Sequence, residues 1–582
     1  MSWRGLLPLL APCALLVVGG LVGFPFSLDT AVARERLLGL IVASLLAAIV
    51  CVGLRRVERP RGLLVGTSVI ALLAGGWVIA ASGADVFRGT VGTILQAIFR
   101  PVFGLAQVTD AVEVANTRFI VGYNGLADLC LVAIFCCGAL LPHWRLWKSK
   151  SALGLLAGIA VSLILLVGTG ARGGLTGLAS GVCAVGLFAW PRRFALLALV
   201  AAPVTLIAAT LGILDKGLEF SSTAGRLTYW GDLARLLVEY PLTGVGLGVD
   251  TANRVALQYE INPDPERIFY AHNTFVQSYL EQGPLGALGM VLVPLAALAA
   301  IVVARRNGVV PGRRALLVAG LGIVFGLEAH GLTDQVVTTN VGTAMVLIGL
   351  AAVVAGLSTS AIEVLGRVTR MALVGLAALA VVGLVLLVAI PGGRAQVLLD
   401  LGGLELNQAL ALNPQSPSRA AALAQAENTL GLALAQDGGH PAILRALARV
   451  RSTRYDDSGA LEALRQAAES TRLDAFDMLQ IGHLYRDFGF AEQGYAWAAR
   501  AYAAWGRPPE DAVMQVYAQS TLAILDDDRA KTLADQAETA MRWRLFSEAH
   551  TLFQQALVFE PDSPYLQDRL GAAQRAVAKY GT

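Results

Sequence analysis

The chain has 582 residues, of which 55% are hydrophobic and only 15% are charged, so it is not an ordinary soluble protein. The formal net charge of +3 conceals two unlike parts: residues before 392 carry about eight excess positive charges and the remainder about five excess negative charges. This asymmetry is typical of membrane topology and argues against a soluble protein that binds polyanions.

Long apolar runs occupy the first two-thirds of the chain. Each has about twenty residues, which is enough to cross a hydrocarbon core of about 30 Å. The first run follows a single Arg, as in a signal peptide, but it is long and lacks a small-residue cleavage site, so we interpret it as a span. We predict an all-α polytopic membrane bundle with eleven spans at about 5–27, 36–54, 63–82, 120–141, 152–170, 173–190, 194–213, 284–303, 314–332, 340–358 and 371–390.

The positive charges between these spans predict the orientation of the chain. Basic residues gather in alternate short loops, and cytoplasmic loops of membrane proteins carry this excess. We therefore expect a cytoplasmic N-terminus, with residues 83–119, 214–283 and everything after 391 on the outer side. The basic loops hold Arg55, Arg56, Arg59 and Arg61; Arg145, Lys148 and Lys150; Arg192 and Arg193; Arg305, Arg306, Arg313 and Arg314; and Arg367 and Arg370.

The composition changes after Pro391-Gly392-Gly393 to a helical pattern rich in Ala, Leu, Gln, Arg and Asp. Small residues recur there at similar intervals, which lets paired helices approach closely. The tail resembles the tetratricopeptide repeat family over most of 400–580, and an irregular helical bundle is the alternative. We expect two domains, a membrane domain at 1–391 and helical repeats at 392–582. The recurring positions are Gly482, Tyr485, Gly489, Gly494 and Ala501; Ala549, Ala556, Pro561 and Gly571; and Ala409 and Pro414.

Neither the cysteines nor the glycine-rich stretches indicate a metal or a cofactor. All six cysteines lie in apolar spans, at spacings that fit neither a metal site nor a disulfide framework. The sequence contains no P-loop and no nucleophile elbow, and the glycine run at 244–248 lacks the strand–turn–helix unit of a dinucleotide site. We therefore expect no cofactor and no metal, and an energy-coupled pump is disfavoured.

The predicted outer loop at 214–283 holds most of the unusual polar residues. Ser221, Ser222 and Thr223 are good helix caps, and the apolar pattern that follows predicts a helix ending before Pro241. Arg226 falls in the first turn of this helix, where the positive end of the helix disfavours a cation. A guanidinium placed there suits a phosphate, and a snorkelling or loop-paired Arg is the alternative.

Arg172, in the stretch GTGARGGLTG, is a second candidate for binding an anion. It lies at the predicted outer mouth between two spans, among small residues that permit close backbone approach. An ionisable residue at this depth suggests a function, and structural pairing with Asp334 or Glu328 is the competing interpretation. Together with His330, these two acidic residues mark the outer end of the span at 314–332, where they line the same cavity or cap the helix.

His272 and Asn273 begin the stretch HNTFVQSYLEQGPLG, at the boundary between the outer loop and a span. An imidazole at a membrane–water boundary is costly to bury and well suited to proton transfer. It can also be a simple amphipathic anchor. Glu281, nine residues further on, could orient a base or cap the span.

Together, these residues resemble the O-antigen ligase and O-antigen polymerase superfamily of bacterial inner-membrane glycosyltransferases. The resemblance covers roughly 150–340, and it departs from the frequent Ser-Arg pair of the family by having Ala171-Arg172. The matching residues are His272-Asn273, then nine residues, then Gly283-Pro284-Leu285-Gly286; Gly225-Arg226 with Trp230; Pro241 and the turn Gly244–Gly248; and Arg172-Gly173.

This resemblance implies transfer of a glycan from an undecaprenyl diphosphate carrier to a lipid or glycan acceptor on the periplasmic face, without nucleotide sugar or metal. Arg172 and Arg226 would hold the diphosphate, whose developing charge two guanidiniums can stabilise. His272 would accept the proton of the acceptor hydroxyl or position that hydroxyl. The remaining substrate-binding candidates are Asn273, Trp230, Glu281 and Asp334.

Three activities share this architecture: ligation to lipid A-core as in lipopolysaccharide, polymerisation of O-antigen or exopolysaccharide repeats, and O-linked protein glycosylation. We favour a ligase or polymerase in the bacterial inner membrane, with a tail that binds a partner protein or the growing polymer and with no nucleic-acid partner. A non-enzymatic scaffold or a flippase is the alternative of a different class. A flippase should carry polar residues through the membrane middle, whereas here the unusual residues gather on one face.

Overall fold

The computed structural model describes residues 3–57, 60–82, 94–95, 122–141, 150–189, 230–231, 233–234, 236–259, 271–333, 340–413, 416–488, 490–505, 525, 527–542 and 545–580. Across these residues the chain is helical and forms no named strand, apart from one isolated bridge between Val309 and Leu357. The all-α prediction is confirmed for the described part of the chain.

The chain divides into two compact units. The first, which we call the membrane unit, comprises residues 1–24, 31–230 and 270–378. The second, which we call the tail unit, comprises residues 25–30, 231–269 and 379–582. The tail unit is therefore assembled from three separate stretches of sequence. Two of these stretches lie within the predicted membrane domain at 1–391.

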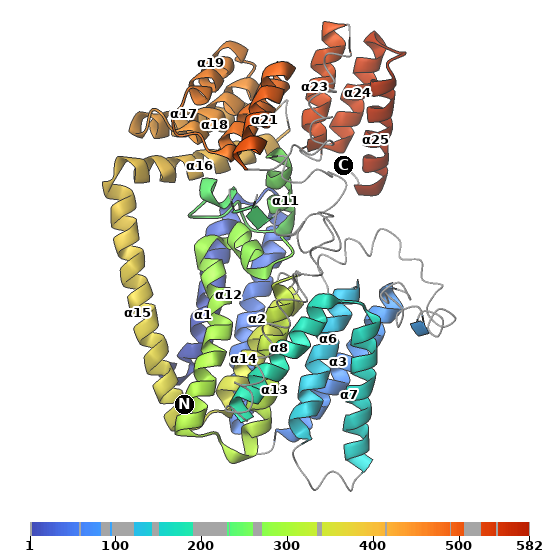
Figure 1. Ribbon diagram of the computed structural model, residues 1–582, viewed down its shortest axis with the longest axis vertical. Coiled ribbons are helices and arrows are strands. Elements are labelled where there is room, and N and C mark those ends of the chain that lie inside the picture. The colour runs from blue at the N-terminus through green and yellow to red at the C-terminus, as the bar shows by residue number, and fades with distance from the viewer. Residues whose placement is uncertain are drawn as a thin grey trace. The chain divides into compact units, whose positions relative to one another are not determined.

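The membrane unit is a bundle of apolar helices (Figure 1). Eight described helices are long and apolar enough to cross a membrane, and α7 and α14 are shorter apolar helices. Ten of the eleven predicted spans coincide with these helices, and the span predicted at 194–213 lies outside the described residues. The helices are α1 (Leu7–Gly23), α2 (Thr30–Arg56), α3 (Arg61–Ser82), α6 (Gly122–Leu140), α7 (Lys150–Gly168), α8 (Arg172–Ala189), α12 (Thr274–Asn307), α13 (Arg314–Gly331), α14 (Asn340–Gly356) and α15 (Thr359–Ala389).

Glycines set the closest helix contacts of the membrane unit. A Cβ atom added to Gly177 on α8 would lie 2.5 Å from the carbonyl oxygen of Gly326 on α13, and one added to Gly181 would lie 2.6 Å from that of Gly322. Helices in a membrane gain little from the hydrophobic effect, so small residues at their interface promote close van der Waals packing. The glycine pattern of α8 therefore fixes this helix, and Arg172 at its start, against α13.

One helix, α15, runs from the membrane unit, which ends at Ala378, into the tail unit, which resumes at Leu379, and few of its side chains are buried. Only four of its residues, at positions 361, 362, 365 and 366, are buried. Every residue from Met371 to Ala389 is exposed or half-exposed, although the sequence there is almost entirely apolar. Such a helix is solvated by lipid.

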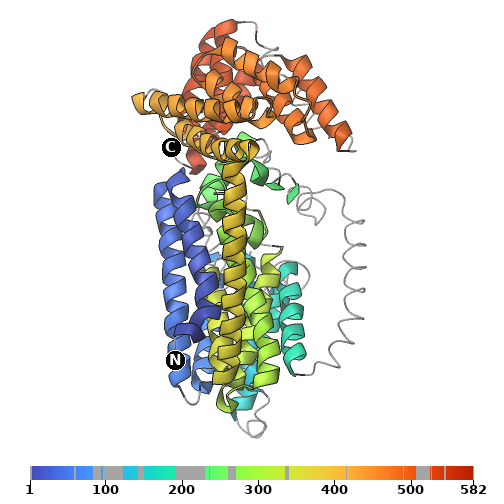
Figure 2. The same cartoon turned by 90° about the vertical axis from the view of Figure 1, so that its left-hand side faces the viewer.

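The tail unit consists of short helices that pack in successive pairs (Figure 2, orange to red). Helix α16 begins at Pro391, where the composition of the sequence changes. Gly482 and Gly494 lie where α20 and α21 meet, and a Cβ on Gly482 would be 2.8 Å from the carbonyl oxygen of Gly494. The assignment to the tetratricopeptide family stays a prediction. The helices are α11 (Val249–Gln258), α16 (Pro391–Ala411), α17 (Pro417–Gln436), α18 (Pro441–Thr453), α19 (Asp457–Ala468), α20 (Ala475–Asp487), α21 (Ala491–Ala504), α23 (Asp528–Arg542), α24 (Phe546–Phe559) and α25 (Pro564–Tyr580).

Candidate functional site

Two side chains of the membrane unit bind the backbone of Ala271, directly before His272. The indole Nε1 of Trp230 donates to the carbonyl oxygen of Ala271 at 2.5 Å, and the Ala271 amide donates to Oε1 of Gln277 at 3.0 Å. His272 itself has a φ of 47°, in the left-handed region that few residues other than glycine adopt. A strained backbone persists only where its surroundings determine it, and such positions cluster at functional sites. Trp230, predicted to bind substrate, therefore contacts the backbone beside His272.

Asn273 caps α12. Its Oδ1 accepts hydrogen bonds from the amides of Phe275 and Val276, at 3.0 and 3.1 Å. Its Nδ2 donates to the carbonyl oxygen of Leu332, just after α13, at 3.2 Å. An N-cap of this kind stabilises a helix by about 1 kcal/mol. The side chain of Asn273 thus starts one helix and ties it to the end of another, while its predicted contact with substrate stays a prediction.

Glu281 is buried and bound to a cation that the sequence reasoning missed. Nε of Arg36, on α2, lies 3.4 Å from its Oε2, and Nε2 of Gln277 donates to its Oε1 at 2.8 Å. Nη1 of Arg36 also donates to Oδ1 of Asn340 and Oγ1 of Thr343, both from α14. Gln277 therefore links Glu281 to the backbone amide of Ala271, the residue before His272, by two hydrogen bonds. The stretch Arg34-Glu35-Arg36 was the available signal, but it stands at the start of a predicted span and resembles ordinary flanking charge.

The glycines of the His272 stretch shape α12. Gly283 has φ 62° and ψ −163°, a non-helical conformation that places a kink directly before Pro284. Gly286 lies against α1, because a Cβ added to Gly19 would be 2.7 Å from the Gly286 amide nitrogen. Glycine is favoured at the kink by its positive φ and at position 286 because a Cβ atom there would lie 2.3 Å from Cβ of Gln282. The two glycines that follow His272-Asn273 in the sequence motif therefore have structural roles in α12, one at its kink and one at its contact with α1.

Arg172 begins α8 directly after the turn at Gly170, and its side chain is exposed. Its neighbour Gly173 packs against the last turn of α13. A Cβ on Gly173 would lie 2.4 Å from Cδ2 of His330 and 2.6 Å from Oγ1 of Thr333. Asn273 contacts Leu332 in the same turn, so the residues that adjoin Arg172 and His272 meet at residues 330–333.

Buried polar groups support this end of α13. Nδ1 of His330 lies 2.7 Å from Oδ1 of Asp128 on α6, and both side chains are almost fully buried. Glu328 is buried as well, and neither of its carboxylate oxygens has a hydrogen-bond partner among the described residues. The alternative considered for Arg172, an ion pair with Glu328, is absent from the ion pairs between described residues. Asp334, the other suggested partner, lies outside them.

Arg226 also lies outside the described residues, as does most of the first half of its predicted helix. The described residues from Trp230 to Glu239 are helical, and the helix ends before Pro241 as predicted. Gly244, Gly246 and Gly248 all have positive φ, which confirms the predicted glycine turn. Within the described part of the chain, no three His, Cys, Asp or Glu side chains are grouped closely enough to hold a metal ion.

Comparison with known proteins identifies one family. Residues 157–291 match the family model Wzy_C, described as O-Antigen ligase. The matched range contains Arg172, Arg226, Trp230 and the His272–Gly286 stretch, whereas Arg36 and the tail helices lie outside it. No curated protein and no solved structure matches the chain.

Proposed function

We propose that this chain, which carries an O-antigen ligase domain in residues 157–291, transfers a glycan from a polyprenyl diphosphate to an acceptor at the outer face of a bacterial inner membrane, as a ligase or a polymerase. One observation carries the proposal beyond the family match. Asn273, beside His272, and Gly173, beside Arg172, both contact residues 330–333 at the end of α13. An imidazole just before α12 and a guanidinium at the start of α8 are thus both held near one helix end.

The proposed reaction needs a group that accepts the hydroxyl proton and cations that stabilise the leaving diphosphate. The acceptor hydroxyl oxygen attacks the anomeric carbon, and the bond from that carbon to the diphosphate oxygen breaks with its electron pair staying on the phosphate. The hydroxyl proton passes to His272. Arg172 and Arg226 stabilise the charge that develops on the leaving diphosphate, since a guanidinium presents several donors in a fork that suits phosphate.

The composition of the tail unit supports the proposed outer location of the site. Its three stretches, 25–30, 231–269 and 379–582, pack together. Oγ1 of Thr251 accepts a hydrogen bond from the Leu28 amide at 3.0 Å, which joins the first stretch to the second. The charge pattern of the loops independently assigns the second stretch, and the third from residue 392 onward, to the outer side. Segments that fold together must lie on one side of a membrane, so the two arguments agree.

Complementation of a strain that lacks the chain tests the proposal. We expect His272→Ala, Arg172→Ala and Arg226→Ala to abolish glycan transfer while membrane insertion persists, and Arg226→Lys to be poorly active because a point charge does not replace the guanidinium fork. Arg305→Ala, which changes an exposed residue in the last turn of α12, is the matched control. The measurement is the size distribution of surface glycan.

Each product pattern of the deletion strain has a distinct meaning. Single-repeat products indicate a polymerase, and full-length polymer that stays lipid-linked indicates a ligase. Protein that lacks its glycan indicates an oligosaccharyltransferase. Normal glycan in every arginine and histidine variant would instead point to a non-enzymatic scaffold.

A further inference from the structure

The segment that joins Trp230 to Ala271 has a folded core of its own. We call residues 231–269 the loop segment. Its described residues are 231, 233–234 and 236–259. Tyr240 is only 2% exposed, and Val245, Leu247 and Val255 are fully buried. Tyr240 lies against α16, because a Cβ atom added to Gly403 would be 3.0 Å from its ring, and the loop segment belongs to the same compact unit as the tail helices.

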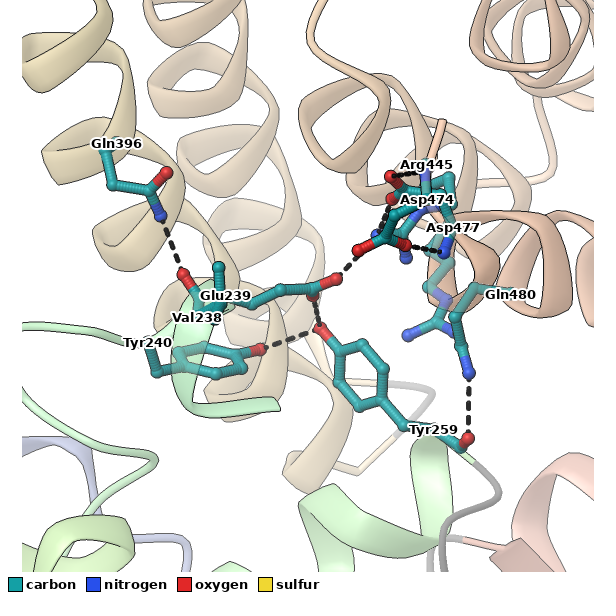
Figure 3. Close-up of polar contacts among 10 residues, drawn as sticks. Val238, Glu239, Tyr240, Tyr259, Gln396, Arg445, Asp474, Asp477 and Gln480 are labelled. Atoms are coloured by element: carbon teal, nitrogen blue, oxygen red, sulfur yellow. Dashed lines mark hydrogen bonds and ion pairs between the residues drawn. The ribbon is translucent and has the colours of Figure 1, made fainter. Parts of the chain in front are cut away.

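A buried ion pair joins the loop segment to the tail helices (Figure 3). Nη2 of Arg445, on α18, lies 2.6 Å from Oε1 of Glu239 and 2.7 Å from Oδ1 of Asp477 on α20. The Tyr259 hydroxyl donates to Oε2 of Glu239 at 2.6 Å. Burial alone would lower the pKa of Arg445, but the two carboxylates outweigh it and raise the pKa, so the guanidinium stays charged. Removal of the cation would leave two carboxylates facing each other in a buried site.

Both the ring and the backbone of Tyr259 contact tail helices. The ring stacks on Phe476 of α20 with centroids 6.1 Å apart, and Arg449 of α18 lies 4.6 Å from the ring centre. The carbonyl oxygen of Tyr259 accepts a hydrogen bond from Nε2 of Gln480 at 2.9 Å. Burial is the main reason that the pKa of Tyr259 lies well above its usual value, so the hydroxyl remains a donor.

Helix α16 contacts the loop segment at residues 240–243. Asp400 accepts from the Leu242 amide and from the Thr243 hydroxyl, both at 2.9 Å. Nδ2 of Asn407 donates to the Tyr240 hydroxyl at 3.1 Å. Residues from α16, α18 and α20 thus fix the loop segment at two places, near Glu239–Thr243 and at Tyr259.

We infer that these tail helices form an internal clamp on the loop segment and that Arg445 is a positioning residue for glycan transfer. The clamp consists of Glu239, Tyr259, Arg445 and Asp477. Glu239 follows Trp230 by nine residues and Tyr259 precedes Ala271 by twelve, so the clamp restrains the segment at two points between the residues that the Trp230–Ala271 hydrogen bond joins. The tail then acts within the transferase itself, whether or not it also recruits a partner. The part of this inference that concerns activity rests on the proposed function.

Hydrogen–deuterium exchange of the full-length protein in detergent tests the clamp directly. We expect Arg445→Ala, on the tail side, and Tyr259→Ala, on the loop side, to speed amide exchange in residues 236–259 by roughly tenfold or more, because both release the segment locally. The control is Arg472→Ala, which removes an exposed ion pair with Asp437 within the tail. It should leave exchange in the loop segment unchanged.

Surface glycan from complemented cells tests the link to the reaction. Arg445→Ala and Tyr259→Ala should each reduce glycan transfer severely, and their combination should be no worse than either alone because both remove one coupled unit. Arg445→Lys keeps a cation between the carboxylates and should restore part of the activity. Arg472→Ala should remain normal.

Each contrary result has a definite meaning. Unchanged exchange of residues 236–259 in both clamp variants would overturn the clamp. Faster exchange with normal glycan, in cells where His272→Ala abolishes glycan, would overturn the positioning role of Arg445. If His272→Ala also leaves the glycan normal, the proposed function fails, while the exchange data still decide whether the clamp exists.

Discussion

The backbone of His272 stores strain at the proposed proton acceptor. Its φ of 47° costs about 1–2 kcal/mol for a residue that carries a Cβ atom. Glycine would relieve this strain, although glycine also loses about 0.5–1 kcal/mol more backbone entropy on folding than alanine. The two effects nearly cancel, so the fold gives no stability advantage to histidine at this position. A functional demand explains the residue better.

We therefore expect His272→Gly to abolish glycan transfer while the thermal unfolding temperature of the purified protein stays at or above that of the wild type. Unfolding in detergent and surface glycan in complemented cells measure the two effects separately. His272→Ala keeps the Cβ atom and the strain, so it is the control for backbone relief. A lower unfolding temperature for the glycine variant than for the alanine variant would contradict the strain argument.

Asp400 makes the tail unit sensitive to pH. Burial raises the pKa of its carboxyl from the usual 3.8 to about 6, against the opposing hydrogen bonds from Leu242 and Thr243. Because the folded state then holds the proton more tightly than the unfolded chain, this group lowers stability as the pH rises from about 4 to about 6. The difference in pKa corresponds to about 3 kcal/mol at neutral pH.

We expect Asp400→Asn to remove this part of the pH dependence. Between about pH 4 and pH 6 the wild type should lose stability relative to the variant, and the gap should stay constant above that range. Circular dichroism of thermal unfolding in detergent, compared between the two proteins at each pH, measures it. A difference that does not change with pH would contradict the raised pKa.

At the residue scale, local spacing was informative and distant pairing was not. The motif identified His272, Asn273 and Trp230, and the structure brings all three to one place through contacts of Ala271 and the start of α12. Arg36 could not be found in this way, because its partner Glu281 is 245 residues away and neither residue has an unusual neighbourhood in the sequence. The pair can be recognised only in the folded protein, where the side chain of Arg36 reaches Glu281.

At the scale of elements, the glycines of α8 explain how Arg172 is held. The distances at Gly177 and Gly181 leave no room for a side chain between α8 and α13. A larger residue would force the helices apart, and overpacking of this kind typically costs 1–3 kcal/mol. It would also move Arg172 away from the end of α13, where Gly173 contacts His330.

We expect Gly177→Leu to reduce glycan transfer strongly and to broaden the size-exclusion profile of the detergent-extracted protein. Gly66→Leu on α3 is the matched control, because a Cβ at Gly66 meets nothing within 4 Å. A Gly177→Leu protein with wild-type activity would show that α8 does not set the position of the proposed site.

Most membrane helices could be predicted from the sequence because the bilayer requires a fixed length of apolar residues. Ten predicted spans coincide with described helices, and the helix before Pro241 ends where expected because proline cannot continue it. The extent of α12 was predicted less well. It begins at Thr274 rather than near 284. Its first turns contain polar residues such as Gln277 and Glu281, whose side chains are buried.

At the scale of the whole molecule, the division into units could not be predicted. The sequence suggested a solvated outer loop and a separate tail, whereas residues 231–269 and the tail helices form one unit. The contacts responsible, such as Glu239 with Arg445, join polar residues that resemble ordinary surface residues in each local sequence. Their burial depends on a partner about two hundred residues away.

The proposed topology can be tested by labelling engineered cysteines with a membrane-impermeant thiol reagent. Ser458→Cys, exposed in the tail, should react in intact spheroplasts, and Asn307→Cys, exposed at the last residue of α12, should react only after lysis. The native protein provides the background, since five of its six cysteines are buried. Reaction of both variants in intact spheroplasts would contradict the assigned sides.

The ion pair between Glu239 and Arg445 also has a consequence for biosynthesis. The two residues are 206 positions apart, and a ribosome adds about 5–20 residues per second, so the loop segment waits about 10–40 s for its partner to be made. During that interval its apolar side chains, including Tyr240, have no tail helices to cover them. A newly made chain therefore passes through a stage in which this segment lacks its partner, and completion of the tail ends that exposure.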